Sequence, residues 1–214
     1  MAASASVASC ADEPIPVVIG IDASSEEQVV LGEIYSQIFD AMGYAAGVSS
    51  FGGAEALDPL EILRAEPVDL VVTCTGAVLE TYDSAAAAEL AASGMEGEEL
   101  SVATYDAAVG TLPATMRTVD PSPAQGCGYT DGERLVQNII PVFRNGKFDR
   151  GTIQRINFIT RMMATEDIAE SAEKVGQGVP ADVAVADWLL EYAGIAPGPA
   201  GGAVVSIDPE QPPV

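Results

Sequence analysis

Three short apolar segments alternate with helix-like segments over the first 92 residues, and this alternation constrains the fold most. The apolar segments, each typical of a short buried strand, are Pro16–Gly20, Ala46–Phe51 and Asp69–Cys74. After the first of them, apolar residues recur at helical spacing at Val30, Ile34, Ile38 and Met42. Because each helix carries the chain back to the edge where the previous strand began, such strands pair in parallel. The sequence therefore predicts an α/β fold with a mostly parallel twisted sheet flanked by helices.

The chain is less regular after residue 92. Helices are expected at residues 54–65 and from residue 75 to about 92, before a stretch rich in Gly and Pro at 93–134. Short strands are expected within that stretch at Leu100–Thr104 and Met116–Val119. Val136–Phe143 contains Pro141, which indicates an edge or bent strand because proline lacks a backbone N–H.

Three more helical patterns complete a single domain. They cover residues 149–163, 166–175 and 181–193. The expected organisation is an N-terminal linker at 1–14, one α/β lobe at 15–194 and a tail rich in Pro and Gly at 195–214.

The charge and the missing residue types exclude several functions. Asp and Glu number 32 against 9 Lys and Arg, a net charge of -23, which argues against nucleic acid and anionic lipid as partners. The chain has no His, no zinc-type Cys spacing and no phosphate-binding Gly-rich motif, so we expect no metal and no cofactor. No nucleophile–base pair is apparent, and an enzyme is not expected. No apolar run reaches the roughly 18–20 residues that a membrane-spanning helix needs.

The basic residues are unevenly distributed. Six of them and one acid, Asp149, lie between residues 134 and 161. One interpretation is a basic face that balances an acidic domain. The alternative is a docking patch, centred on Arg150, Arg155 and Arg161, for an acidic partner surface or lipid headgroups.

The three cysteines bear on the cellular compartment. Val7–Cys10 resembles a bacterial lipobox, in which Cys10 would carry the lipid, although a basic region and a full apolar region do not precede it. The alternative is an accidental match. With Cys10 lipidated outside the cytoplasm, Cys74 and Cys127 remain as a pair that can form one disulfide, the alternative being two buried free thiols.

An ordered set of segments resembles the solute-binding proteins of ABC importers for quaternary ammonium compounds, the family that binds glycine betaine, choline or carnitine. The longest segment is Val18–Gly43, with Glu27–Gln28 and Leu31–Tyr35 in the family's order. The further matching segments are Gly52–Gly53, Asp69–Gly76, Asp120–Ala124, Asn138–Arg144, Thr165–Ile168, Pro180–Ala184 and Trp188–Leu189.

The resemblance implies an extracytoplasmic lipoprotein in the transport of an osmoprotectant, with a fold like type II periplasmic binding proteins. In the family, segments like Asp120–Ala124 and Asn138–Arg144 are separated by a second lobe, but here only Gln125–Gln137 joins them. We therefore expect one lobe, which binds a small quaternary amine weakly or as a homodimer and which has an ABC permease as its partner. Contact with the membrane is expected only through the anchor at Cys10.

The resemblance also places the binding residues, at the carboxyl ends of the parallel strands. The candidates are Ser24, Ser25, Glu26, Phe51, Gly52, Thr73, Cys74, Thr75 and Tyr129. Phe51 and Tyr129 would form a cation–π cage, in which Cys74 replaces a family tyrosine. The same placement brings Cys74 and Cys127 together as a disulfide across one sheet edge. The alternative for these positions is ordinary capping and turn chemistry, and the alternative function is a single-lobe interaction module without a ligand.

Overall fold

A computed structural model describes residues 14–51, 58–64, 67–128 and 135–196. The sequence expectations on Cys10, Gly52, Tyr129 and the tail after residue 196 concern positions that lie outside these residues. The strands are β1 (Pro16–Ile21), β2 (Ala45–Ser50), β3 (Leu70–Cys74), β4 (Met116–Thr118) and β5 (Ile139–Arg144). The helices are α1 (Glu26–Ala41), α2 (Pro59–Arg64), α3 (Thr75–Tyr82), α4 (Ser84–Ala92), α5 (Gly97–Thr111), α6 (Arg150–Met162), α7 (Thr165–Gly176), α8 (Ala181–Ala184), α9 (Ala186–Trp188) and the π-helix η1 (Leu189–Ala193).

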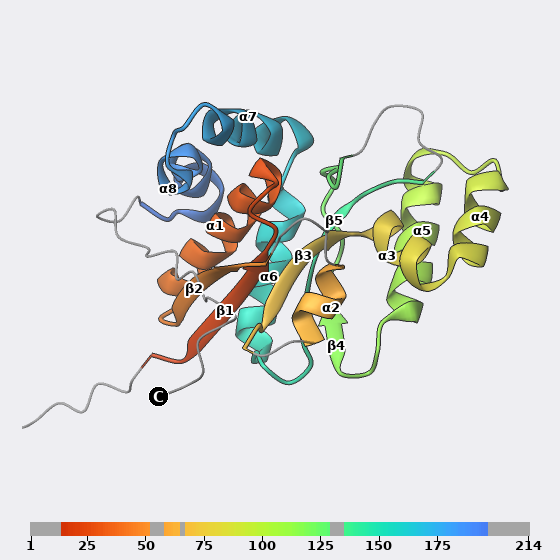
Figure 1. Ribbon diagram of the computed structural model, residues 1–214, viewed down its shortest axis with the longest axis horizontal. Coiled ribbons are helices and arrows are strands. Elements are labelled where there is room, and N and C mark those ends of the chain that lie inside the picture. The colour runs from red at the N-terminus through yellow and green to blue at the C-terminus, as the bar shows by residue number, and fades with distance from the viewer. Residues whose placement is uncertain (1–13, 52–57, 65–66, 129–134, 197–214) are drawn as a thin grey trace, which may run out of the picture.

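One five-stranded sheet, in the order β2-β1-β3-β5-β4, forms the centre of the lobe (Figure 1). Strand β1 pairs in parallel with β2 and β3, whereas β5 is antiparallel to both β3 and β4. Four of the five strands therefore point the same way, and the expected single α/β lobe with a mostly parallel sheet is confirmed.

The sheet separates two apolar cores. Alternate strand residues face opposite sides, so that Ile19 and Leu70 join one core and Val71 and Ile140 join the other. Helices α1, α6 and α7 cover the first face, and α2, α3 and α5 cover the second. Figure 1 shows α3, α4 and α5 grouped at one end of the molecule, with α1, α7 and α8 at the other.

Three sequence expectations about these elements were wrong. Leu100–Thr104 is part of helix α5, not a strand. Its buried residues, Leu100, Thr104 and Ala108, recur every four positions on one helical face. The Ala-rich helix expected to end near residue 92 is two helices, because Asp83 leaves the helical conformation and accepts a hydrogen bond from the N–H of Ala86, capping α4.

The third correction concerns β5, which is an inner strand despite Pro141. The Pro141 carbonyl accepts a hydrogen bond from the Thr118 hydroxyl, so the backbone at this residue faces β4. The pairing of β4 with β5 ends at Thr118 opposite Val142, so no β4 residue pairs with Pro141. The missing N–H therefore costs the sheet no ladder hydrogen bond.

None of the described helices is both long and apolar enough to cross a bilayer.

Candidate functional site

The parallel strands bring the described candidate residues to one edge of the sheet, but most of them serve the backbone there. Ser25 caps α1 by accepting a hydrogen bond from the N–H of Gln28 at 3.2 Å. The hydroxyl of Ser24 donates to the Asp22 carboxylate at 2.6 Å, and this contact lowers the pKa of Asp22. Glu26 is exposed, in the first turn of α1. These three positions match the capping and turn alternative.

The residues that follow β2 and β3 are largely covered. Phe51 is half-buried and packs against the core that contains α2 and α3. Thr73 and Thr75 are buried, and the Thr75 hydroxyl donates to the backbone carbonyl of Val136 at 3.3 Å. Neither threonine is therefore available as a surface ligand for a solute.

The chain itself occupies the start of helix α3. The side-chain oxygen of Gln137 accepts a hydrogen bond from the N–H of Ala77 at 2.9 Å. A Cβ atom at Gly76 would lie 2.6 Å from the amide nitrogen of Gln137 and 2.8 Å from the carbonyl oxygen of Val136. Glycine at this position thus lets the returning chain lie directly on the helix N-terminus, where a donor group would otherwise face solvent.

A disulfide fixes the same edge. Cys74, at the end of β3, is bonded to Cys127, and their Cα atoms lie 6.1 Å apart. This is the pairing that the family resemblance implied. A Glu27 carboxylate oxygen and the two sulfurs lie within 4.8 Å of one another, but sulfurs in a disulfide are not thiolate ligands, so the oxidised cluster is not a metal centre.

The segment that leaves the sheet after β4 and the segment that returns to it before β5 run side by side next to the disulfide. The N–H of Ser122 donates to the Ile139 carbonyl, and the N–H of Ile139 donates to the Ala124 carbonyl. Gln125 and Asn138 then form an antiparallel bridge. The chain therefore leaves and re-enters the sheet at one point, in agreement with the expectation of a single lobe.

Glu27 is the notable residue that the sequence analysis did not include in the site. Its carboxylate accepts a hydrogen bond from the N–H of Cys127 at 2.8 Å, a contact between residues 100 positions apart. Burial raises the pKa of the Glu27 carboxyl above its ordinary value, and the hydrogen bond from Cys127 opposes this shift. Among the described residues, no Lys or Arg forms an ion pair with it. The sequence signal for Glu27 is the Glu27–Gln28 pair of the family resemblance, which by itself gives no role to the carboxylate.

Glu27 lines a small pocket between the start of α1, α7 and the segment Gln125–Gly128, which is called the link below. The pocket measures about 190 Å³ and is lined by Glu27, Gln125, Gly126, Gly128, Thr165, Ile168, Ala169 and Ala172. A Cβ atom at Gly126 would lie 2.8 Å from the Glu27 carboxylate, so glycine is needed for the link to approach α1. The pocket therefore combines one negative charge with an apolar wall from α7.

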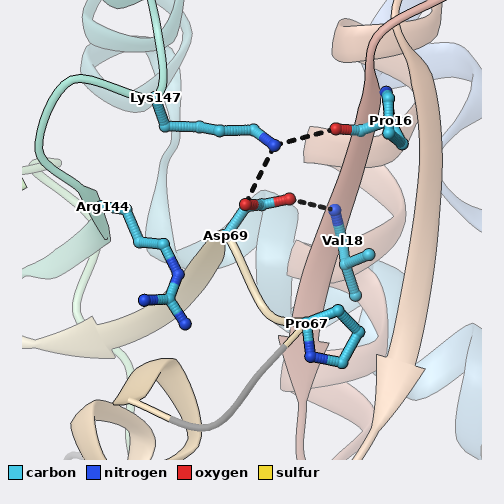
Figure 2. Close-up of a pocket in the computed structure, with 6 residues that line it drawn as sticks. All are labelled: Pro16, Val18, Pro67, Asp69, Arg144 and Lys147. Atoms are coloured by element: carbon cyan, nitrogen blue, oxygen red, sulfur yellow. Dashed lines mark hydrogen bonds and ion pairs between the residues drawn. The ribbon is translucent and has the colours of Figure 1, made fainter.

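A second pocket lies at the opposite edge of the sheet, near the amino ends of β1 and β3 (Figure 2). The Asp69 carboxylate accepts from the N–H of Val18 and from the Lys147 ammonium, both at 3.0 Å, and the ammonium also donates to the Pro16 carbonyl. Both charges are largely buried and joined to the backbone, which indicates a structural ion pair between β1, β3 and the end of β5.

We expect Asp69→Ala to lower the free energy of unfolding by about 2 kcal/mol, because it leaves the Val18 N–H and a largely buried ammonium without their acceptor. Urea unfolding would measure the change. Glu80→Ala, on the exposed surface of α3, is the control and should change stability by less than about 0.5 kcal/mol. An equally small effect for Asp69→Ala would contradict the structural role.

A scan against models of known protein families finds no match to this chain. A search of curated proteins finds no match either.

Proposed function

We propose that this chain is an extracytoplasmic solute-binding protein of an ABC transport system, built from one lobe, that binds a small quaternary amine. The observation that carries the proposal is the Glu27 pocket: a half-buried carboxylate without a cationic partner among the described residues, beside an apolar wall. A carboxylate in such a setting favours a cation, because ionised groups removed from water are stable only when paired.

The pocket chemistry suits a quaternary ammonium group in two ways. The methyl groups of a quaternary ammonium ion spread its positive charge over an apolar surface and donate no hydrogen bond. Ile168, Ala169 and Ala172 offer apolar contacts to the methyl groups, while Glu27 offers the countercharge. This arrangement differs from the expected cage of Phe51 and Tyr129, because here a carboxylate replaces cation–π attraction as the main polar contact.

The disulfide supports a location outside the cytoplasm. Disulfides persist in oxidising environments, outside the cytoplasm, and Cys74–Cys127 spans 53 positions of the chain. Among the described residues, no second lobe closes over the pocket. We therefore expect weak binding by a single chain, or binding strengthened by a partner that supplies the second wall.

A titration followed by amide NMR tests the proposal. Choline, glycine betaine, carnitine and proline betaine would be added separately to the oxidised protein. We expect saturable shifts at Glu27, Gly126 and Ala169, around the pocket, and little change at Thr73 and Thr75. No shift with any of the four compounds would overturn the proposal.

The second candidate function is an interaction module that retains the lobe as a scaffold and binds no solute. It is favoured by the seating of Gln137 and Val136 on the start of α3, because the chain itself occupies part of the edge where solutes bind in open α/β sheets. Failure of all four titrations, together with capture of an envelope protein other than a permease, would support this alternative.

A further inference from the structure

Helix α6 carries a basic and apolar stripe on its outer face. The stripe, called the α6 stripe below, consists of Arg150, Arg155, Phe158, Arg161 and Met162. Phe158 is 48% exposed, and the half-buried Arg155 guanidinium lies over its ring at 5.6 Å while it donates a hydrogen bond to the Ala193 carbonyl. The exposed cations of the stripe are therefore Arg150 and Arg161. Arg161 has only a long contact of 3.9 Å with Asp120, in which both side chains are mostly exposed. The stripe thus presents cations beside apolar surface that solvent covers in the isolated chain.

Helix α5 carries an acidic and apolar groove, on the other face of the sheet. The surface, called the α5 groove, is shallow and open to solvent and is lined by Met95, Glu98, Glu99, Val102, Ala103 and Asp106. Val102 is 53% exposed, and Val109 on the same helix is also exposed. None of the three acids forms an ion pair with another described residue.

The two surfaces are opposite in charge, and both expose apolar side chains. They hold three of the seven large apolar side chains that are exposed in the described part of the chain, namely Val102, Phe158 and Met162. Apolar side chains ringed by charge mark interaction surfaces more often than scattered ones do. The cations of the α6 stripe can pair with the acids of the α5 groove, so the two surfaces are electrostatically complementary.

We propose that the α6 stripe of one molecule docks into the α5 groove of a second copy. Because the stripe and the groove are different surfaces on opposite faces of the sheet, the contact is head-to-tail and leaves one free stripe and one free groove in each pair. Assembly can therefore continue beyond the dimer. This proposal does not depend on solute binding, since the Glu27 pocket includes no residue of either surface.

The net charge of -23 opposes association at long range but not at contact. At physiological ionic strength the Debye length is about 8 Å, so acids remote from the interface are largely screened. The facing charges lie within that distance in a docked pair. We therefore expect association that is weak and visible at high protein concentration.

A charge exchange between the two surfaces tests the proposal. One variant carries Arg150→Glu and Arg161→Glu on the α6 stripe, and the other carries Glu98→Lys and Glu99→Lys on the α5 groove. In sedimentation equilibrium, the mass of the wild-type chain should rise with concentration above the monomer mass of 22.0 kDa. Each variant alone should remain monomeric, because its stripe and groove then carry the same sign.

An equimolar mixture of the two variants should associate again, since the acidic stripe of one variant fits the basic groove of the other. Glu166→Lys with Glu173→Lys on α7, which makes the same change in net charge as the variant of the α5 groove, is the control and should associate like the wild type. Amide NMR spectra would establish that every variant is folded. A wild-type chain that stays monomeric, variants that still associate, or a mixture that does not associate would each overturn the proposal.

Discussion

Replacing Cys74 and Cys127 together with alanine is expected to lower the free energy of unfolding by about 4 kcal/mol. The bond closes a loop of 53 positions, and the entropy that this closure removes from the unfolded chain gives an estimate of that size. Cys74 is buried at the end of β3, so the variant also loses packing at the sheet edge. Thermal and urea unfolding in oxidising buffer would measure the loss.

Reduction of the wild-type protein is the matched control, because it opens the same loop without changing the side-chain packing as much. Its unfolding free energy should fall almost to that of the double alanine variant. The amide signals of Gln125–Gly128 should change most, since the disulfide and the Glu27 hydrogen bond hold this link against the lobe. An oxidised protein no more stable than the reduced one would contradict the role assigned to the bond.

The central sheet was predictable because its parallel strands are encoded locally. Each of β1 and β3 is a run of apolar residues long enough to be buried on both faces, and α1 has apolar residues at helical spacing. Helix α5 was not predictable in the same way. Its buried positions are Leu100, Thr104 and Ala108, and a Thr and an Ala give little hydropathy contrast with the exposed face.

The candidate site was only partly predictable, because its decisive contacts are long-range. The turn contact of Ser24 with Asp22 and the capping role of Ser25 involve residues near in the chain, and both agree with the capping and turn alternative. In contrast, Glu27 meets the backbone of Cys127 and Gln137 meets the backbone of Ala77 only because the link folds across the sheet edge. Neither contact has a signature in local spacing.

Glu27→Gln is expected to weaken the binding of choline by about tenfold to a hundredfold, the size of a lost charge-assisted contact. Glutamine keeps an acceptor for the N–H of Cys127 and nearly the same shape, so the link should stay in place. NMR titration of the variant would measure the affinity. Glu33→Gln is the matched control, because Glu33 is also a half-buried carboxylate of α1 but does not line the pocket, and its variant should bind choline like the wild type.

The same carboxylate should make binding depend on pH. Burial raises the pKa of Glu27 above its ordinary value of 4.5, so affinity should be constant near neutral pH and should fall as pH falls through the raised pKa. Protonation of Glu27 is more favourable in the folded state than in the unfolded state. The charge therefore destabilises the free protein at neutral pH, and this cost is relieved as pH falls.

The unfolding free energy of the Glu27→Gln variant distinguishes a binding role of Glu27 from a structural one. Glu27→Gln should raise the free energy of unfolding at neutral pH while it weakens choline binding, because a group kept for a ligand costs stability when the ligand is absent. Glu33→Gln should also raise stability, since burial raises the pKa of Glu33 as well, but should leave binding unchanged. A Glu27→Gln protein that is less stable than the wild type would indicate that the negative charge of Glu27 strengthens the hydrogen bond to Cys127 by more than its burial costs, and this would contradict a charge kept for a cation.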